Sequence, residues 1–255
     1  MRFASLGSGS EGNALVVQTG KTFALLDCGF PLTDTCMRLA RLGLTPDCLS
    51  GIVVTHEHGD HIAGVARLAR KYSIPIWLTH GTFRAQLKLL SNIPKLTKID
   101  SHHPFVIDGL LVQPFPVPHD AAEPVQYVFS DGAKRLGVLT DIGCSTPHIE
   151  AMLSGCDALV LECNHDAAML ANSAYPQSLK HRVGGRFGHL NNADAATLLA
   201  QLDYSHLQHI VAAHLSRKNN TPELAVHALS TALNCNPEWV AVATQDEGFT
   251  WREIV

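Results

Sequence analysis

Four residues with metal-binding side chains lie within six positions, in the stretch His56-x-His58-x-Asp60-His61. The apolar residues 52–54 before it predict a buried strand, and residues 62–70 after it carry apolar side chains at helical spacing. A turn between a strand and a helix is rigid enough to aim several side chains at one point. Imidazole and carboxylate together suit zinc, manganese or iron, so the stretch predicts a metal site.

Three more residues of ligand type stand at or just after the ends of predicted strands. His119 follows the strand at 110–117 and is well placed to be a third imidazole ligand. Asp141 closes the strand at 135–140 and could be either a metal ligand or a structural cap. His214 ends the strand that begins at residue 209. With the motif upstream, a metal ligand explains His119 better than an ordinary loop histidine does.

Two polar segments are candidates for phosphate binding. The loop at 7–13 is rich in glycine and serine, so its exposed N–H groups could approach a phosphate or the metals, although an ordinary hairpin loop has the same composition. Residues 162–166 are mostly polar and follow a buried strand, so we expect them at the same edge of the fold as the predicted metal ligands. Ser8 and Asn164 are our candidates from these two segments.

A third candidate is His189, which lies just outside the N-terminus of a helix predicted at 192–202, a favourable place to meet an anion. The basic residues between 180 and 186 could hold a phosphate backbone, but a solvated basic face explains them equally well. They are Lys180, His181, Arg182 and Arg186.

Composition narrows the class of protein. The chain has 255 residues, is 46% hydrophobic and carries a formal net charge of −4, which gives no global signal for nucleic-acid binding. No apolar run is long enough to span a bilayer. The first residues enter a strand-like pattern without a signal-peptide region, so we expect a cytoplasmic protein without membrane contact. Seven cysteines without a C-x-x-C pair argue against a disulfide framework.

The order of predicted elements favours an α/β layered fold in one compact domain, residues 1–255. We expect helices at 32–42, 62–70, 80–91, 147–154, 192–202 and 222–233, with 167–187 less regular. We expect strands at 2–6, 13–19, 22–27, 52–54, 74–78, 96–100, 104–107, 110–117, 125–130, 135–140, 158–161 and 209–214, and two more within 239–252.

The ordered set of Asp27, the H-x-H-x-D-H stretch, His119, Asp141 and His214 resembles the metal motifs of the metallo-β-lactamase-fold hydrolases over nearly the whole chain. The segments at 6–13, 118–124, 162–166 and 188–192 look like the YycJ/WalJ-type branch, which is associated with 5′-to-3′ exonuclease or phosphodiesterase activity. This resemblance implies an αββα sandwich with two divalent transition-metal ions at one edge.

The resemblance also implies roles for single residues. His56, His58 and His119 would hold one metal, while Asp60, His61 and His214 would hold the other, with Asp141 bridging the two. Asp27 would orient the metal loop without being a ligand. His189 resembles the histidine of the RNase Z relatives that serves the scissile phosphate, so we expect a phosphate-binding or proton-donating role for it. Asp60 is counted with His189 among the catalytic candidates.

Three departures weigh against a secreted antibiotic hydrolase. Position 141 carries Asp where many zinc β-lactamases use Cys, His61 completes a motif that those enzymes generally lack, and we see no export signal. We also see no insertion that could form the separate cap domain of the larger RNA-processing nucleases.

The expected chemistry is hydrolysis of a phosphodiester. Two metals about 3.5–4 Å apart can share a bridging water, lower its pKa to about neutrality and direct the hydroxide at phosphorus. The expected substrate is a nucleic-acid end or a small phosphodiester. A metallo-hydrolase of cyclic phosphodiesters, lactones or thioesters is the alternative, and a non-catalytic metal sensor or scaffold is a third reading that the complete ligand set disfavours. The sequence leaves the metal, the cleavage polarity and the oligomeric state open.

Overall fold

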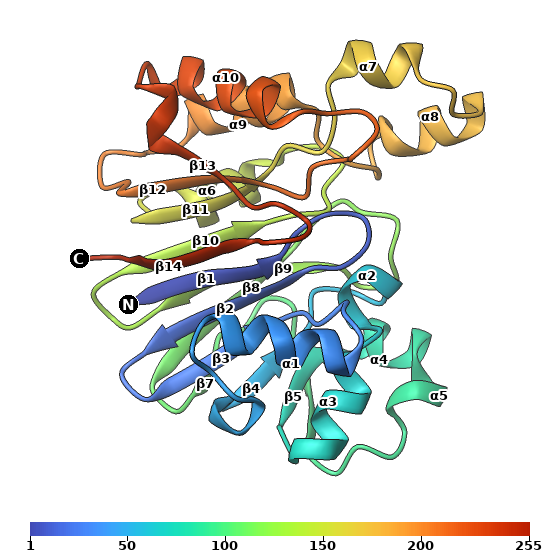
Figure 1. Ribbon diagram of the computed structural model, residues 1–255, viewed down its shortest axis with the longest axis vertical. Helices are drawn as coiled ribbons and strands as arrows, with labels where there is room; N and C mark the ends of the chain where they lie inside the picture. The colour runs from blue at the N-terminus through green and yellow to red at the C-terminus, as the bar shows by residue number, and fades with distance from the viewer.

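The computed structural model describes all 255 residues and contains two seven-stranded sheets packed face to face (Figure 1). The first sheet has the strand order β14-β1-β2-β3-β4-β5-β6, and the second has β13-β12-β11-β10-β9-β8-β7. In each sheet an antiparallel set of strands is followed by parallel strands joined through helices.

The strands of the first sheet are β1 (Arg2–Gly7), β2 (Ala14–Thr19), β3 (Thr22–Leu26), β4 (Gly51–Val53), β5 (Ile76–Thr79), β6 (Leu96–Ile99) and β14 (Phe249–Glu253). Those of the second are β7 (Phe105–Ile107), β8 (Leu110–Pro116), β9 (Val125–Ser130), β10 (Arg135–Leu139), β11 (Ala158–Glu162), β12 (His209–Ala213) and β13 (Val240–Val242). Short 3₁₀ helices span Pro46–Cys48 and Pro237–Trp239.

Helices cover the outer face of each sheet. The first sheet is covered by α1 (Leu32–Arg41), α2 (Gly59–Ile62), α3 (Val65–Tyr72), α4 (His80–Ala85) and α5 (Leu87–Leu90). The second is covered by α6 (Pro147–Leu153), α9 (Asn192–Gln201) and α10 (Pro222–Leu233). Helices α7 (Ala167–Asn172) and α8 (Gln177–Val183) lie beyond the ends of its strands, at the upper right of Figure 1. The αββα sandwich expected from the sequence is therefore confirmed. None of these helices has both the length and the apolar run needed to cross a bilayer.

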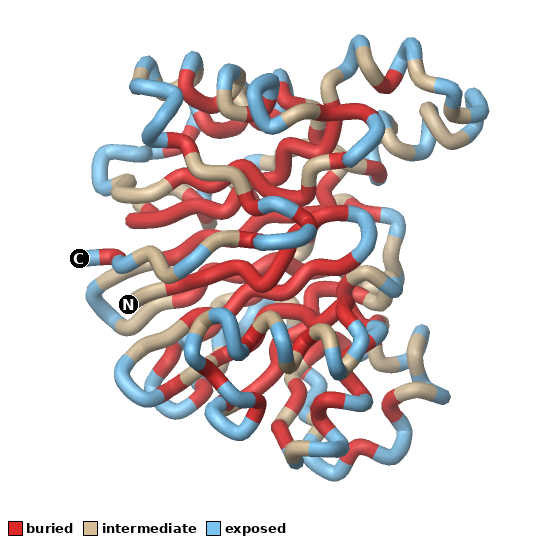
Figure 2. The backbone as a smooth tube through the Cα atoms, in the orientation of Figure 1, coloured by how far each residue is buried: buried red, intermediate tan, exposed pale blue.

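Period-two alternation along the strands builds three buried layers. Leu25 packs under the helices of the first sheet, whereas its neighbour Leu26 packs between the sheets. Leu159 and Val160 divide in the same way in β11, toward the outer helices and toward the inter-sheet core. Both faces of each central strand are thus buried, as Figure 2 shows, and the sheets form a rigid base for the loops at their edge.

Two helices that we expected to be continuous are broken. The helix expected at 62–70 is divided into α2 and α3, because Gly64 donates its N–H to the Cys28 carbonyl and packs where a Cβ would clash with the Phe30 carbonyl. The helix expected at 80–91 is interrupted at Gln86, which separates α4 from α5. The less regular region at 167–187 contains α7 and α8.

Candidate metal centre

The predicted ligands meet at one edge of the sandwich. His56 and Asp60 follow β4, His119 follows β8, and Asp141 and His214 follow β10 and β12. The chain termini lie at the opposite edge (Figure 1). Because these strands run in the same direction across the sandwich, their C-terminal loops come together although they are far apart in sequence.

The ligand atoms form two groups that could each hold a metal ion. The first group is His56, His58 and His119, and the second is Asp60, His61, Asp141 and His214. Within each group the ligand atoms lie within 4.8 Å of one another. The structure therefore brings together all seven residues that the sequence analysis assigned as ligands.

Asp141 lies between the two groups. Its Oδ2 is 2.9 Å from Nε2 of His61 and its Oδ1 is 3.6 Å from Nε2 of His214 in the second group. The same Oδ1 is 3.9 Å from Nε2 of His119 in the first group. One buried carboxylate thus faces ligands of both groups, as a bridging ligand must.

Asp27 and Thr55 fix the tautomers of two imidazoles. Asp27 accepts hydrogen bonds from the Thr55 N–H (2.8 Å), the Thr55 hydroxyl (2.9 Å) and Nδ1 of His61 (2.8 Å). Since the Thr55 proton goes to Asp27, its oxygen can accept from Nδ1 of His56, 2.9 Å away. Both histidines then use Nδ1 for these hydrogen bonds and present Nε2 as the nitrogen for a metal.

The other imidazoles are oriented by oxygen acceptors too. His119 donates from Nδ1 to the Gly188 carbonyl (3.1 Å), and His214 donates from Nδ1 to Oε1 of Glu162 (3.1 Å). His58 differs, because its Nδ1 is the atom that faces Nε2 of His119, at 3.3 Å. Two nitrogens bound tetrahedrally to one zinc ion would be about 3.3–3.4 Å apart, so this spacing suits a shared metal.

Unpaired nitrogen atoms support the fit of metal ions to this donor set. Nε2 of His56 and Nε2 of His214 are buried and have no hydrogen-bond partner. A buried polar atom without a partner is costly, and a metal ion would satisfy both atoms. Neutral imidazole with carboxylate oxygen is also a donor set that divalent transition metals accept.

Without metal ions, carboxylates control the protonation of the second group. Burial lowers the pKa of His61, but the carboxylates of Asp141, Asp27 and Asp60 outweigh it and hold that pKa well above its usual value. Burial likewise opposes protonation of His214, but the nearby carboxylates of Asp141, Asp60 and Glu162 raise its pKa to about 10. In the first group, burial lowers the pKa of His56 and of His119. The second group therefore holds protons that a metal would displace.

Glu162 is a site residue that we did not single out from the sequence. Its side chain is fully buried, and its Oε1 accepts hydrogen bonds from Nδ1 of His214 and from Nδ1 of His189 (2.9 Å). Its Oε2 accepts from the N–H groups of Ile142 and Leu190, at 3.0 and 3.1 Å. Burial opposes ionisation, but His189 and His214 lower the pKa of Glu162 to about 2. An acidic residue that ends an apolar strand was the available signal, since a buried charge needs partners.

A cavity of about 310 Å³ opens above the metal ligands. His58, Asp60, Asp141 and His214 form its metal-facing part, and His189 lines it beside them. The remaining lining residues are Ser10, Gly59, Asp120, Leu179, Arg182, Val183 and Gly188. The cavity lies in the size range of small-ligand sites, and most of its lining residues are polar, which suits a charged substrate.

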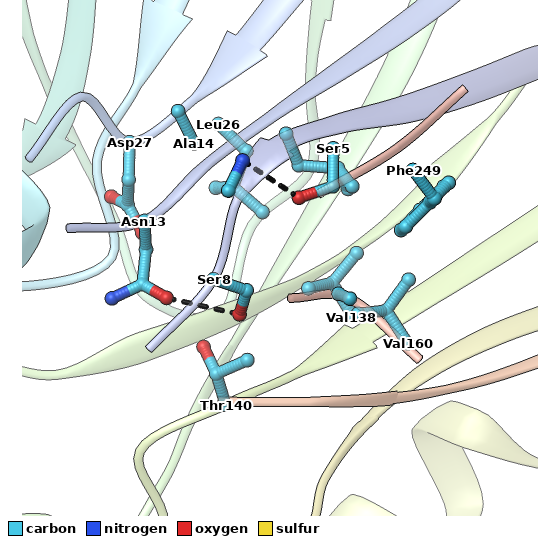
Figure 3. Close-up of a pocket in the computed structure, with 13 residues that line it drawn as sticks. Ser5, Ser8, Asn13, Ala14, Leu26, Asp27, Val138, Thr140, Val160 and Phe249 are labelled. Carbon is cyan, nitrogen blue, oxygen red and sulfur yellow. Dashed lines mark hydrogen bonds between the residues drawn. The ribbon is translucent and has the colours of Figure 1, made fainter. Parts of the chain in front are cut away.

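Ser8 and Asn164 lie behind His214 and not among the residues that line this cavity. Ser8 accepts the N–H of His214 (3.0 Å) and donates to Oδ1 of Asn13 (3.0 Å), and Nδ2 of Asn164 donates to the His214 carbonyl (3.0 Å). Figure 3 shows Ser8 and Asn13 on a separate inter-sheet cavity of about 30 Å³, too small for a nucleotide. Ser8 also lines a second separate cavity, of about 450 Å³, together with Ser216 and Arg217. Both side chains thus contact His214, and the phosphate-binding role that we expected for them stays a prediction.

Comparisons with known proteins fit this site. A family profile described as Beta-lactamase superfamily domain matches residues 22–215. The exodeoxyribonuclease YycJ of Bacillus anthracis is 38% identical over 91% of this chain and 89% of its own. The exodeoxyribonuclease WalJ of Streptococcus pneumoniae is 32% identical over 88% of this chain and 85% of its own. The crystal structure of the metallo-beta-lactamase fold protein YhfI from Bacillus subtilis has a TM-score of 0.75 over 99% of both chains, at 17% identity.

Proposed function

We propose that this chain, which belongs to the β-lactamase superfamily and is one of its hydrolases, is a dinuclear metal-dependent exonuclease. Within the superfamily it belongs to the branch of the YycJ and WalJ proteins. The observation that carries the proposal is the position of Asp141 between two groups of ligands, directly under the cavity that His189 lines. A site with two metal positions and a neighbouring imidazole suits hydrolysis of phosphodiesters.

In this proposal His56, His58 and His119 hold one ion, and Asp60, His61 and His214 hold the other, with Asp141 shared. When bound, such a pair of ions supplies Lewis-acid stabilisation of the phosphate charge and activates water. Zinc, manganese and iron all accept a donor set of nitrogen and oxygen. Asp60 lines the cavity as well, so it combines the ligand role with contact to the reacting region.

His189 is the residue that we propose for proton transfer or phosphate binding. Its Nδ1 donates to Glu162, which leaves Nε2 as the nitrogen that can meet a substrate. Burial lowers its pKa, but the charge and hydrogen bond of Glu162 outweigh burial and raise it above the usual value. A histidine held in this state can bind a phosphate oxygen or give a proton to the leaving oxygen.

The proposed substrate is a DNA end, cleaved in the 5′-to-3′ direction. Two relatives that match most of this chain are named exodeoxyribonucleases, and the polar cavity above the ligands suits a phosphate-bearing substrate. A small-molecule metallo-hydrolase remains the alternative outcome of the experiment that follows.

The test is a panel of substrates with the purified protein and several divalent metals. End-labelled DNA and RNA, a cyclic nucleotide, a lactone and a thioester should be compared, and we expect release of nucleotides from DNA ends. Elemental analysis should find close to two transition-metal ions per chain. A response to the lactone or thioester alone would overturn the nuclease proposal.

Variants separate the roles of the site residues. His58→Ala and Asp141→Ala should lose both metal and activity, whereas His189→Ala should lose activity and keep the metals. His227→Ala, an exposed histidine on α10, is the matched control and should behave as wild type. Unchanged turnover in Asp141→Ala would rule out the proposed centre.

A further inference from the structure

Phe187 is an exposed aromatic residue that immediately precedes two residues lining the cavity. Its side chain is 57% exposed, and the next two residues, Gly188 and His189, both line the cavity. The other exposed large aromatic residues, Tyr204 and Trp239, lie in segments that lead into the N-terminal ends of β12 and β13, at the edge away from the metal ligands. Phe187 is therefore the one exposed large aromatic residue of the chain beside the proposed centre.

The backbone that carries Phe187 is held by the loops of the metal centre. Asp120 donates its N–H to the Phe187 carbonyl at 3.0 Å. Gly143 packs so closely against Arg186 and Phe187 that an added Cβ would clash with their backbone atoms. The Gly188 carbonyl accepts the hydrogen bond from His119. An exposed ring on a firmly packed turn is preorganised to meet a ligand.

Arginine side chains flank the ring along the chain. Arg182 lines the cavity and is paired with Asp120, with 2.7 Å between Nε and Oδ2. Arg186 is exposed and forms no ion pair. Guanidinium groups close in the chain to an aromatic residue match the alternation of phosphate and base in a nucleic-acid strand.

The charge of the whole chain makes a stacking contact important. The formal net charge is −4, so the protein has no general basic field to attract a polyanion. Affinity for a nucleic acid must then come from a few local contacts, and stacking of a base on an aromatic ring requires no net charge. Paired bases inside a duplex present only their edges, so the ring would need an unpaired base.

We propose that Phe187, flanked by Arg182 and Arg186, is the stacking platform for an unpaired base at the end of a nucleic-acid strand whose phosphate lies at the metal centre. This inference rests on the proposed nuclease function. It adds a requirement for the end of the strand to be unpaired, either in a single strand or through fraying of a duplex end.

The experiment measures binding of the metal-loaded protein to short, phosphorothioate-linked single strands that resist cleavage. Phe187→Ala should weaken binding about 5- to 150-fold, the effect of losing one stacked base. Phe187→Trp should restore binding and Phe187→Leu should not, since an aliphatic side chain fills the space without stacking. Tyr204→Ala removes another exposed aromatic residue, 42% exposed, at the opposite edge and should bind as wild type does.

An abasic site moved along the strand identifies the stacked base. Removal of the base at one position should weaken binding to wild type, and the same removal should have no effect on Phe187→Ala. The loss in Phe187→Ala should also persist at high salt, whereas the loss in Arg186→Ala should shrink as salt rises.

Equal binding of wild type and Phe187→Ala, full restoration by leucine, or the same abasic profile in both proteins would overturn the inference. If wild type releases nucleotides from no DNA or RNA end, the nuclease proposal fails instead. The two failures are distinguishable, because the binding measurement does not depend on turnover.

Discussion

Replacement of Glu162 by glutamine should disturb the orientation of the His189 and His214 imidazoles while leaving both residues in place. The Glu162 carboxylate accepts four hydrogen bonds, two on each oxygen, from His189, His214 and the N–H groups of Ile142 and Leu190. An amide replaces one of these oxygens by a donor, so two of the four bonds are lost whichever way it is oriented. Because each bond to a buried charge contributes about 1.5–3 kcal/mol, the free energy of unfolding should fall by about 3–6 kcal/mol.

Metal binding and activity should fall as well. Outer partners of metal-ligating histidines typically contribute 10- to 100-fold in metal affinity or activity, so we expect a loss of about that size in Glu162→Gln. The assays are denaturant unfolding of the metal-free protein, competition with a metal chelator, and kcat/KM on the best substrate of the panel.

Asp157→Asn is the matched control, because Asp157 lies immediately before the same strand, β11, at its other end. It is also a buried carboxylate and accepts hydrogen bonds from the Arg135 N–H (2.9 Å) and from the Gln208 side chain (3.2 Å). Its replacement should reduce stability and leave metal affinity and turnover unchanged. Wild-type metal affinity and kcat/KM in Glu162→Gln would refute the reasoning, as would an equal loss in both variants.

Three more predictions follow from the site. Gly29→Ala should lose stability and metal because its Cβ would clash with the carbonyl of the metal loop, whereas Gly59→Ala, with open space around it, should be close to neutral in melting experiments. Thr55→Val keeps the shape and removes the hydroxyl, and chelator competition should reveal about 10- to 100-fold weaker metal binding, with wild-type affinity contradicting the tautomer argument. Because neighbouring carboxylates raise the pKa of His61 and His214, metal binding at neutral pH should release about two protons and weaken as pH falls, which calorimetry in buffers of different ionisation enthalpy can measure. Metal uptake without proton release would contradict that assignment.

The layers of the fold and the residues of the metal centre could be predicted from the sequence because both leave strong patterns. Alternation along the strands is imposed by burial on two faces, and ligands must be residues of a few chemical types. Helices α7 and α8 left no such pattern, because α8 buries no residue and α7 buries only Leu170. Periodicity reports burial, so helices that lie on the surface escape it.

The direction of a polar side chain at a strand end was the part that the sequence could not supply. Ser8, Asn164 and Glu162 all stand close to His214 in space, and each was visible as a polar residue near a predicted rim. Whether such a residue faces the substrate or supports a ligand from behind depends on local backbone angles. Composition and spacing carry no information on those angles, so the contacts of Ser8 and Asn164 with His214 were not foreseen and Glu162 was missed.

The backbone angles of three other residues affect how the metal centre is held together. Asp27, Asp141 and His214 have φ values of 59°, 52° and 55°, in the left-handed region that side chains other than glycine rarely adopt. At about 1–2 kcal/mol each, the three residues together store about 3–6 kcal/mol of backbone strain. The hydrogen bonds of Asp27 offset part of this strain. Asp141 and His214 face one another, with 3.6 Å between Oδ1 and Nε2, and this Nε2 has no hydrogen-bond partner. Metal ions that bind these residues would offset the rest, so the folded centre and metal binding should stabilise each other, and chelation should lower the melting temperature more than removal of a surface-bound ion would.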